Sequence, residues 1–494
     1  MKYILTGKQM READEFTIKN IGIPSMVLME RAALGVVDAI EDNCKEFHNV
    51  LVVCGSGNNG GDGYAIARLL HIKGYNVSIF FVGKEASRSS ENLAQKNICD
   101  YYQIPVIDVI DNKYDIIIDA VFGTGLSRNI EGALSETIDR LNSIDGYKVA
   151  VDIPSGIHDT TGLVMGNAFK ADLTVAIAFA KRGIMLQPGN QYAGKVTITD
   201  IGIYDDAMTD DENLMFTYEY DDLVKEYPKR KPNSHKGSYG KITMIVGSKG
   251  MAGAAFLSAK AAYMTGAGLV QIYTHEDNRV VLQQLLPEAI ITTYTSYNEE
   301  QLDKILDWSD VIAIGCGLGT CDTAKYILSY VLQKCKVTTV VDADGLNLLS
   351  EDMSLLENCQ QEVVLTPHMK EMAKLMQCSV KELQENRVSS LEEFTSKYPV
   401  TCVMKDARTL VAKNGEKLYL NTSGNAAMAK GGSGDVLAGV IAGTLAQTKE
   451  TFEGTCLAVY LHGLAGDAAR DRLGSYSVLA SDIVDGIVEV LFFA

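Results

Sequence analysis

The sequence predicts an α/β protein with two domains, each built on a parallel β-sheet that helices cover on both faces. Two series of short apolar runs, rich in β-branched residues, alternate with helix-length segments along the 494-residue chain. Strands that are apolar along their whole length are typical of parallel sheets buried on both sides. A single interruption, first acidic and then basic with prolines, separates the two series. We therefore place the boundary near residues 208–222, with domains at 1–212 and 220–494.

The composition excludes several classes of protein. Hydrophobic residues make up 47% of the chain and charged residues 22%, which rules out wholesale disorder. The net charge of −18 has the wrong sign for a nucleic-acid or anionic-membrane surface. No run is long and apolar enough for a membrane span, and the N-terminus becomes charged before a signal peptide could form. The ten cysteines lack zinc-like spacing, so we expect free thiols in a cytoplasmic protein.

The first series begins with helices and continues with six strands. Residues 8–42 have helical apolar spacing, as in MVLMERAALGVVDAI. These helices either cover the sheet or form a dimer contact, and we expect the chain to be a homo-oligomer. The six strands are predicted at Val50–Cys54, Val77–Val82, Ile116–Val121, Val149–Ile153, Leu173–Ile177 and Val196–Ile201.

The second series also contains six strands separated by helix-length segments. They are predicted at Ile242–Val246, Val270–Tyr273, Val311–Ile314, Thr338–Val341, Glu362–Thr366 and Cys402–Met404. The two halves do not look like copies of each other, which indicates a fusion rather than a duplication.

A glycine-rich turn, GSGNNGGDG, follows the first strand of the first series and leads into a helix. Residues 55–60 satisfy the dinucleotide-binding pattern G-x-G-x-x-G, in which backbone amides and a helix N-terminus face a pyrophosphate. The next strand, however, ends in Gly83 and Lys84 and offers no acidic residue for a ribose. An ordinary NAD dehydrogenase is therefore disfavoured.

Polar side chains follow three strands of the first series. Asp62 lies in the glycine-rich turn, Asp119 precedes the loop FGTGLSRN, and Asp152 and Ser155 lie in VDIPSGI. One strand-end aspartate is more often a helix cap or a turn former. Three such strand ends at the carboxyl edge of one sheet predict a common binding site.

The motifs NNGGDG, DAVFGTGL and VDIPSGI, with IGIPSMVLMERAA before them, resemble the NAD(P)H-hydrate epimerase domain over about residues 1–210. The resemblance implies a Rossmann-like three-layer αβα fold that interconverts the R and S forms of the hydrate, with proton transfer by the catalytic residue Asp152. It also implies a K⁺ ion held near Asn59, Asp119 and Ser155, whose oxygen atoms suit a hard cation. The implied hydrate-binding residues are Asn58, Asn59, Gly60, Gly61, Asp62, Gly123, Thr124, Gly125, Leu126, Ser127, Arg128, Asn129 and Asp152.

The strongest local motif of the second half is NTSGNAAMAKGGSGDVLAGVIAG. Its glycines precede an apolar helix whose first turn contains Asp435. Amides at a helix N-terminus can stabilise a phosphoryl group in transfer, and a carboxylate beside them can accept the proton of an attacking hydroxyl. The alternative is a capping aspartate on a tightly packed helix. The full GGSGD string resembles the anion hole and base of ribokinase-fold enzymes.

Five further motifs, GSKGMAGAAF, IGCGLGT, VVDADGLNLL, LTPHMKEMAKL and MKDARTLV, resemble the NAD(P)H-hydrate dehydratase domain over about residues 220–494. The two resemblances together imply a bifunctional NAD(P)H-hydrate repair enzyme with a ribokinase-like second domain. That domain would phosphorylate the C6 hydroxyl of the S hydrate with ADP or ATP and Mg²⁺, using the catalytic residue Asp435, and phosphate would then leave. The implied hydrate-binding residues are Ala254, Gly317, His368 and Asp435. The implied nucleotide-binding residues are Lys405, Asp406, Ala407, Arg408, Thr409, Asn425, Ala426, Ala427, Met428, Ala429, Lys430, Gly431, Gly432, Ser433 and Gly434.

Two residues depart from the family pattern, which usually has glycine at both positions. Lys370 adds a cation near the presumed hydrate, and Asp406 adds an anion near the presumed nucleotide. His368, taken alone, could equally be a packing or capping residue. Two other functions stay open: a ribokinase-fold small-metabolite kinase with an accessory nucleotide-binding domain, and a regulatory protein that senses a nucleotide.

Overall fold

The structure is a computed structural model that describes residues 1–44, 48–203, 211, 213–357, 359–448 and 450–493. The described residues form two compact units, residues 3–215 and residues 216–494, and residues 1–2 belong to the latter. Residue 212, the predicted end of the first domain, lies outside the described residues. Among the described residues, none of the helices combines the length and apolar character that a bilayer crossing needs.

The unit of residues 3–215 contains a parallel sheet with the strand order β4-β3-β2-β5-β6-β7-β9. The chain starts this sheet at β2 in the middle, adds β3 and β4 on one side and then crosses to β5 on the other. Ligands of open α/β sheets bind where the strand order reverses in this way, here between β2 and β5. The strands are β2 (Asn49–Cys54), β3 (Asn76–Phe81), β4 (Val106–Ile107), β5 (Ile116–Ala120), β6 (Tyr147–Val151), β7 (Leu173–Ile177) and β9 (Lys195–Thr199).

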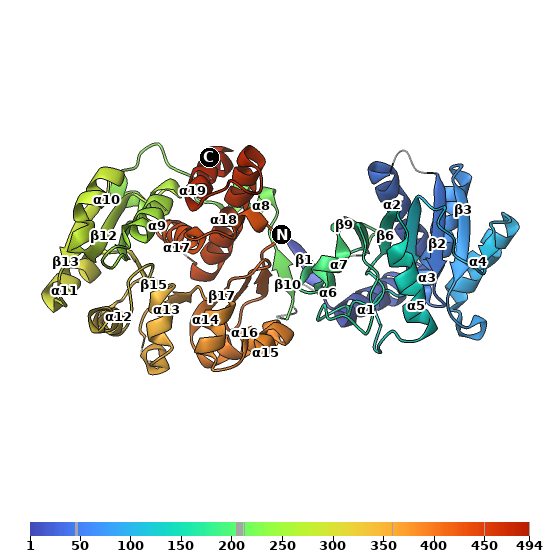
Figure 1. The fold of residues 1–494 in the computed structure, drawn as a ribbon, viewed down its shortest axis with the longest axis horizontal. Helices are drawn as coiled ribbons and strands as arrows, with labels where there is room; N and C mark the ends of the chain where they lie inside the picture. The colour runs from blue at the N-terminus through green and yellow to red at the C-terminus, as the bar shows by residue number, and fades with distance from the viewer. Residues whose placement is uncertain (45–47, 204–210, 212, 358, 449, 494) are drawn as a thin grey trace. The chain divides into compact units, whose positions relative to one another are not determined.

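Helices cover both faces of this sheet and make it a three-layer αβα unit (Figure 1). Alternation along β2 divides the core, because Val50 and Val52 pack with α2 and α3 whereas Leu51 and Val53 pack with α5. The helices are α1 (Gly7–Phe16), a π-helical turn (Thr17–Ile21), α2 (Ser25–Asn43), α3 (Asn58–Ile72), α4 (Ser90–Tyr101), α5 (Ala133–Ser143), α6 (Arg182–Met185) and α7 (Asn190–Ala193). Two short strands, β1 (Lys2–Leu5) and β8 (Ala180–Lys181), pair in parallel beside α1.

The second unit contains a sheet with the order β13-β12-β11-β14-β15-β16-β17-β18-β19-β10. Neighbours from β13 to β17 are parallel, and the pairs β17–β18 and β18–β19 are antiparallel. The strands are β10 (Met215–Thr217), β11 (Lys241–Ile245), β12 (Leu269–His275), β13 (Ile290–Tyr294), β14 (Val311–Ile314), β15 (Thr338–Val341), β16 (Val363–Leu365), β17 (Val400–Met404), β18 (Leu410–Ala412) and β19 (Leu418–Leu420).

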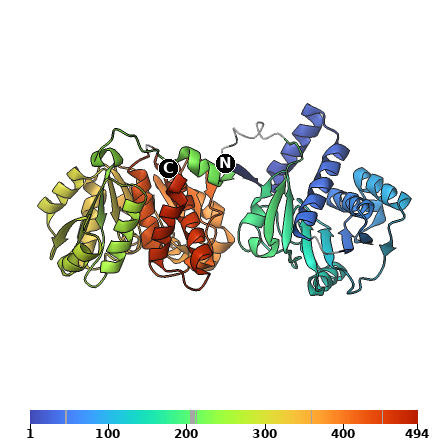
Figure 2. The same ribbon diagram turned by 90° about the horizontal axis from the view of Figure 1, so that it is seen from above.

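Helices α9, α17, α18 and α19 pack against one another on one face of this sheet, and α12, α13, α14 and α16 lie along the other (Figures 1 and 2). Small residues allow α17 to approach α9 closely, since a Cβ atom on Gly439 would lie 2.1 Å from the carbonyl oxygen of Ser258. The helices are α8 (Tyr220–Glu226), α9 (Ala252–Met264), α10 (Arg279–Leu285), α11 (Glu299–Trp308), α12 (Asp322–Lys334), α13 (Asp344–Leu349), α14 (Met369–Leu375), α15 (Val380–Glu385), α16 (Arg387–Lys397), α17 (Ser433–Leu445), α18 (Thr451–Leu473) and α19 (Ala480–Val490).

Each of the twelve predicted strand segments contains a strand, and the ends differ by at most two residues. The predicted parallel pairing is confirmed for the twelve predicted strands, whereas β18 and β19, which are not among them, are antiparallel to their neighbours. The connections from β17 to β18 and from β18 to β19 are short, and a short loop can join only antiparallel neighbours. The helices predicted over residues 8–42 are α1, the π-helical turn and α2.

Candidate functional site

The glycine-rich turn of the first unit connects β2 to α3 and is held by a buried side chain of α4. The Asn92 Nδ2 atom donates hydrogen bonds to the carbonyl oxygens of Gly55 (3.0 Å) and Gly57 (2.9 Å). The Arg88 guanidinium donates in turn to Asn92 Oδ1 at 2.6 Å. Among the residues that the structure describes, no side chain caps α3, which begins at Asn58. The first amides of the helix are therefore available to an anionic ligand.

Asp119, at the end of β5, is completely buried and bound to Ser155. The Ser155 amide donates to Asp119 Oδ2 at 2.7 Å, and its hydroxyl donates to Oδ1 at 2.6 Å. Burial raises the pKa of Asp119 to about 6, although the hydrogen bonds from Ser155 act in the opposite direction. Asp119 and Ser155 thus form a compact cluster of oxygen atoms.

Asp152, just after β6, forms an ion pair with the buried side chain of Lys181. Its backbone has a φ angle of +70°, an unfavourable conformation for a residue with a side chain. Lys181 also donates to the carbonyl oxygen of Ile177 at 2.7 Å. A Cβ atom on Gly123 would lie 3.3 Å from Asp152 Oδ2 and 3.4 Å from Asn59 Oδ1, so the fold brings these three predicted residues together.

Two further carboxyl groups interact electrostatically with this ion pair. Burial, followed by the charges of Asp152 and Asp14, raises the pKa of Asp62 well above its usual range. Burial also raises the pKa of Asp14, on α1, to about 6, with Lys181 opposing the shift and Asp152 adding to it. Burial thus favours the neutral form of the two carboxyl groups that neighbour the Asp152–Lys181 pair.

The remaining predicted hydrate-binding residues of the first unit have different surroundings. Leu126 packs in the core against α5 and is a structural residue. Gly125, Ser127, Arg128 and Asn129 are exposed on the loop after β5. Asn58, Gly60 and Gly61 lie in the first turn of α3, and Thr124 is half-buried beside Gly123.

In the second unit, the motif GGSGD forms the start of α17. Gly432 precedes the helix with a φ angle of +93°, and Asp435 lies in the first turn. The Ser433 hydroxyl donates to the carbonyl oxygen of Met428 at 2.7 Å, which ties this turn to the preceding segment. A Cβ atom on Gly434 would lie 3.5 Å from Lys405 Nζ, so the helix start faces a lysine at the end of β17.

Three strand ends bring further groups to Asp435. Cys316 follows β14, Asp342 follows β15, and the Cys316 sulfur and one carboxylate oxygen of each aspartate lie within 4.8 Å of one another. Asp342 Oδ1 accepts hydrogen bonds from Lys405 Nζ (2.6 Å) and from the Thr366 hydroxyl (2.7 Å). The buried carboxylate of Asp342 thereby fixes the partly exposed cation of Lys405 beside the N-terminus of α17.

The electrostatics of this cluster suit proton transfer near neutral pH. Burial, followed by the charge of Asp342, raises the pKa of Asp435 to about 6. Burial acts to lower the pKa of Lys405, but Asp342 and Glu371 outweigh it and hold the pKa above the usual value. Burial lowers the pKa of His462 to about 4, so this ring stays neutral where it meets the Ser433 carbonyl oxygen at 3.1 Å. Asp435 is therefore ionised at neutral pH, beside a fixed positive charge.

Comparison with known proteins finds a family match within each of the two units. The family described as "YjeF-related protein N-terminus" matches residues 25–183, and "NAD(P)H-hydrate dehydratase" matches residues 242–489. The bifunctional NAD(P)H-hydrate repair enzyme of Moorella thermoacetica is 32% identical over 99% of this chain and 96% of its own length. The chain belongs to this family. The repair enzyme of Escherichia coli is also 32% identical, over 95% of this chain and 90% of its own.

Solved structures similar to the second unit confirm the ribokinase-like expectation. A ribokinase-like superfamily protein from Enterococcus faecalis is 33% identical, with a TM-score of 0.52, and the match covers 57% of this chain and 96% of that one. An ADP/ATP-dependent NAD(P)H-hydrate dehydratase from Bacillus subtilis, co-crystallised with ATP/Mg²⁺, is 28% identical with a TM-score of 0.50 over 56% and 98%. Family membership and fold together confirm the prediction of a bifunctional repair enzyme. They disfavour the two alternatives, a small-metabolite kinase and a regulatory protein.

Within this repair-enzyme chain, the remaining predicted residues of the second unit have mixed environments. A Cβ atom on Gly317 would lie 3.0 Å from Ala254 Cβ, so these two predicted residues meet. His368 caps α14, since its Nδ1 accepts from the amides of Lys370 (3.0 Å) and Glu371 (3.2 Å). The capping alternative for His368 is therefore realised, and Lys370 is exposed.

Most of the predicted nucleotide-binding residues make hydrogen bonds or ion pairs that stabilise two loops. Asp406 pairs with Arg387 at 2.7 Å, so its extra charge is locally balanced. Arg408 donates to the Thr422 carbonyl oxygen at 2.7 Å, and the Asn425 side chain donates to Asp467 at 2.8 Å. The Thr409 hydroxyl donates to the Asp406 carbonyl oxygen, and the Lys430 side chain donates to the Tyr476 carbonyl oxygen. A 3₁₀ turn is formed by Ala426–Met428. No polar side-chain group is available from Ala407, Ala429 and Gly431.

Proposed function

We propose that the second unit dehydrates the S form of NAD(P)H hydrate at the expense of ADP or ATP, and that the first unit interconverts the R and S forms. The observation that carries the first half of this proposal is the position of Asp435. It lies in the first turn of α17, with a pKa of about 6, beside the Asp342–Lys405 pair.

The dehydratase chemistry follows from this arrangement. The ionised Asp435 accepts the proton of the C6 hydroxyl while that oxygen attacks the terminal phosphoryl group of the nucleotide. Lys405 and the amides at the start of α17 stabilise the charge that develops on the phosphoryl oxygens. The C6–O bond then breaks as the ring nitrogen donates its electron pair, phosphate leaves, and loss of a proton from C5 restores the double bond of NAD(P)H.

Mg²⁺ would accompany the nucleotide at this site. The carboxylates of Asp342 and Asp435 are hard oxygen ligands that fit Mg²⁺, whereas the nearby Cys316 thiol is not. Burial and the charge of Asp342 raise the pKa of the Cys316 thiol, which keeps it protonated and unreactive. When bound, the ion supplies positive charge that neutralises the phosphate oxygens.

The first unit is proposed to epimerise the hydrate through Asp152. The carboxylate of Asp152, oriented by Lys181, would take and return a proton as the C6–O bond opens and re-forms. The donor set also fits K⁺, because the Asp119 and Ser155 oxygens lie together. The Asn59 Nδ2 atom is buried without a partner among the described residues, and an amide can turn its oxygen toward a cation. The ion would supply a positive charge beside the dinucleotide phosphates.

Purified protein incubated with chemically hydrated NADPH and either ADP or ATP tests both proposals. We expect the absorbance of reduced nicotinamide to return, and Asp435→Asn to slow the return by at least the ~10²–10⁴-fold typical of a lost general base. Asp152→Asn should leave the S form reactive and stop consumption of the R form. No recovery of absorbance would exclude the dehydratase, and unchanged consumption of both forms by Asp152→Asn would exclude that residue from the mechanism.

We also infer that the protein works in the cytoplasm as a homo-oligomer. The ten cysteines are free thiols, which supports a reducing compartment. Phe16, Ile21 and Leu34 of the N-terminal helices are between 41% and 49% exposed, which supports a contact between copies on this face. Analytical ultracentrifugation tests the oligomer, and a monomer at all concentrations would exclude it.

A further inference from the structure

Helix α1 contains none of the residues predicted for the epimerase site, yet one of its faces borders that site. Gly7 lies so close to the loop after β6 that a Cβ atom on it would be 1.8 Å from Asp159 Oδ2. One turn further along the helix, Arg11 Nη1 lies 3.9 Å from the same oxygen. Asp14, in the next turn, interacts electrostatically with the buried Lys181. Positions 7, 11 and 14 share one side of a helix, so this side of α1 faces the site.

Arg11 also reaches the loop that is predicted to bind the hydrate. Its Nη1 atom lies 4.0 Å from the position of a Cβ atom on Gly125. Two residues earlier in this loop, a Cβ atom on Gly123 would lie 3.3 Å from Asp152 Oδ2 and 3.4 Å from Asn59 Oδ1. A short stretch of one loop therefore connects the guanidinium with the proposed catalytic carboxylate.

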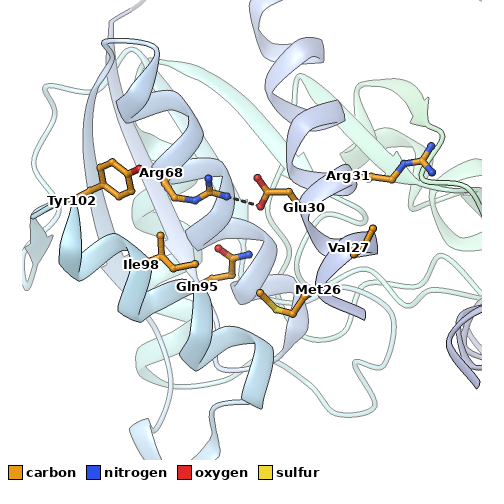
Figure 3. Close-up of a pocket in the computed structure, with 8 residues that line it drawn as sticks. All are labelled: Met26, Val27, Glu30, Arg31, Arg68, Gln95, Ile98 and Tyr102. Atoms are coloured by element: carbon orange, nitrogen blue, oxygen red, sulfur yellow. Dashed lines mark hydrogen bonds and ion pairs between the residues drawn. The ribbon is translucent and has the colours of Figure 1, made fainter. Parts of the chain in front are cut away.

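The guanidinium of Arg11 is open to a ligand. Its side chain is 57% exposed, and 3.9 Å is too long for a hydrogen bond to Asp159. An exposed ion pair of this length contributes little to stability, so a ligand can replace it. Lys181 and Arg68, in contrast, are mostly buried, and each is paired with a carboxylate. Figure 3 shows the pair that Arg68 forms with Glu30 in the hollow between α2, α3 and α4.

We propose that Arg11 binds a phosphate group of the hydrated dinucleotide and thereby holds the hydrate at the epimerase site, an inference that rests on the function proposed for the first unit. A guanidinium stays charged at every working pH, and its paired N–H donors match two phosphate oxygens. NADH hydrate carries two phosphate groups, and NADPH hydrate carries a third. Because the chain has a net charge of −18, a polyanionic substrate gains from an exposed cation beside its site.

NMR of the full chain with arginine labelled with ¹³C at Cζ tests binding, with the Arg11 signal assigned by Arg11→Gln. The probes are NADPH hydrate and NADH hydrate without ADP or ATP, so that dehydration does not consume them. Hydrated reduced nicotinamide riboside, which has no phosphate, is the control. We expect a saturable shift of the Arg11 signal with NADPH hydrate and none with the riboside. Absence of a shift with both dinucleotides, or an equal shift with the riboside, would overturn the proposal.

Epimerase kinetics of Arg11→Gln test the consequence for the reaction. Loss of a charged hydrogen-bonding contact should raise the KM of the R form at least about tenfold. The kcat should stay within about twofold, because a phosphate contact is equally strong in the ground state and in the transition state. Arg11→Lys keeps the charge and should recover part of the affinity. Lys19→Gln is the matched control and should keep the KM of the parent, since it removes an exposed cation that pairs with Glu15 at the surface.

The outcomes separate this role of Arg11 from the proposed function itself. A parent chain that does not interconvert the R and S forms would refute the epimerase, and the NMR shift would then decide phosphate binding alone. If the parent is active and folded Arg11→Gln keeps its KM, or loses only kcat, the role of Arg11 is refuted. An equal rise in KM for both hydrates would assign the contact to the pyrophosphate, and a rise for NADPH hydrate alone would assign it to the third phosphate.

Discussion

Asp14, Asp119 and Asp435 share one electrostatic property: burial raises the pKa of each to about 6. A carboxyl group removed from water favours its neutral form, and a pKa near the working pH suits a group that accepts and returns protons. Asp435 differs from Asp119 in its neighbours. It has a half-buried cation, Lys405, beside it and lies at a helix N-terminus, whereas Asp119 is bound by Ser155.

The dehydratase rate should fall in acid because Asp435 must be ionised to accept a proton. We expect kcat to be half-maximal near pH 6 and to decrease about tenfold for each further pH unit in acid. Initial rates at saturating hydrate and nucleotide, measured from about pH 5 to pH 8, check this. A rate that stays constant down to pH 5 would contradict the assignment of Asp435 as the base.

The same carboxyl group should reduce stability at neutral pH. A pKa that is higher in the folded than in the unfolded state favours folding below about pH 4, and this contribution is lost as the pH rises through 6. Asp435→Asn should therefore raise the free energy of unfolding at about pH 8 by at most about 3 kcal/mol, and the melting temperature with it. Near pH 4 the substitution should have little effect. Asp307→Asn, exposed on α11, is the calorimetric control. A lower melting temperature at pH 8 would show that the ionised carboxylate stabilises the fold.

At the scale of single residues, the sequence predicts motifs better than it predicts which side chains interact with each other. Asp152 and Asp435 stand out because each lies in a glycine-containing string after a strand or before a helix. Lys181 lies 29 residues after Asp152, and Asp342 lies 63 residues before Lys405. Neither spacing has a local signal, because only the carboxyl edge of each sheet brings the partners together. The motif VVDADG, which contains Asp342, is evident in the sequence, but the role of Asp342 as the partner of Lys405 is not.

At the scale of the element, the start of α17 depends on one glycine conformation. Gly432 has a φ of +93°, and a Cβ atom there would lie 2.7 Å from Leu257 Cδ1 and 3.0 Å from Ala480 Cβ. Gly432→Ala should therefore lower the unfolding free energy by about 1–2 kcal/mol. Gly431→Ala is the matched control, since a Cβ atom there meets nothing within 4 Å. Equal melting temperatures for the two variants, measured by calorimetry, would contradict this explanation.

Helix α4 should affect the first active site through Asn92. Asn92→Asp keeps the size of the side chain but turns its two donated hydrogen bonds into repulsion with the carbonyl oxygens of Gly55 and Gly57. We expect the epimerase rate to fall and the dehydratase rate of the same chain to stay unchanged. That second rate is an internal control for protein quantity. Equal losses of both activities would indicate general unfolding instead.

Element prediction succeeds for the central strands and misses several short ones. The central strands β2, β5, β14 and β15 are buried on both faces, and their apolar runs are evident from the sequence. The pair β1–β8 has only two residues in register, Ile4 with Ala180 and Leu5 with Lys181. Such short strands pair because the surrounding fold places them side by side. Two residues are too few for a periodic pattern of apolar residues, so the sequence does not predict these strands.

At the scale of the whole molecule, two compact units with separate ligands should unfold in separable steps. ADP with Mg²⁺ at 100 times its Kd should stabilise the second unit by about 2.7 kcal/mol and leave the first unit unchanged. Differential scanning calorimetry of the full chain should then show one shifted and one constant transition. A common shift of all transitions would mean that the units unfold as one.

The ion pair between Asp406 and Arg387 restricts the order in which its two residues can arise during evolution. Arg387 is 7% exposed and Asp406 is 24% exposed. A guanidinium buried at position 387 opposite a glycine would lose the carboxylate that faces it, which destabilises a buried charge. An aspartate that arises first can still reach solvent. Among descendants of a glycine-containing ancestor, we therefore expect sequences with Asp406 alone to outnumber those with Arg387 alone.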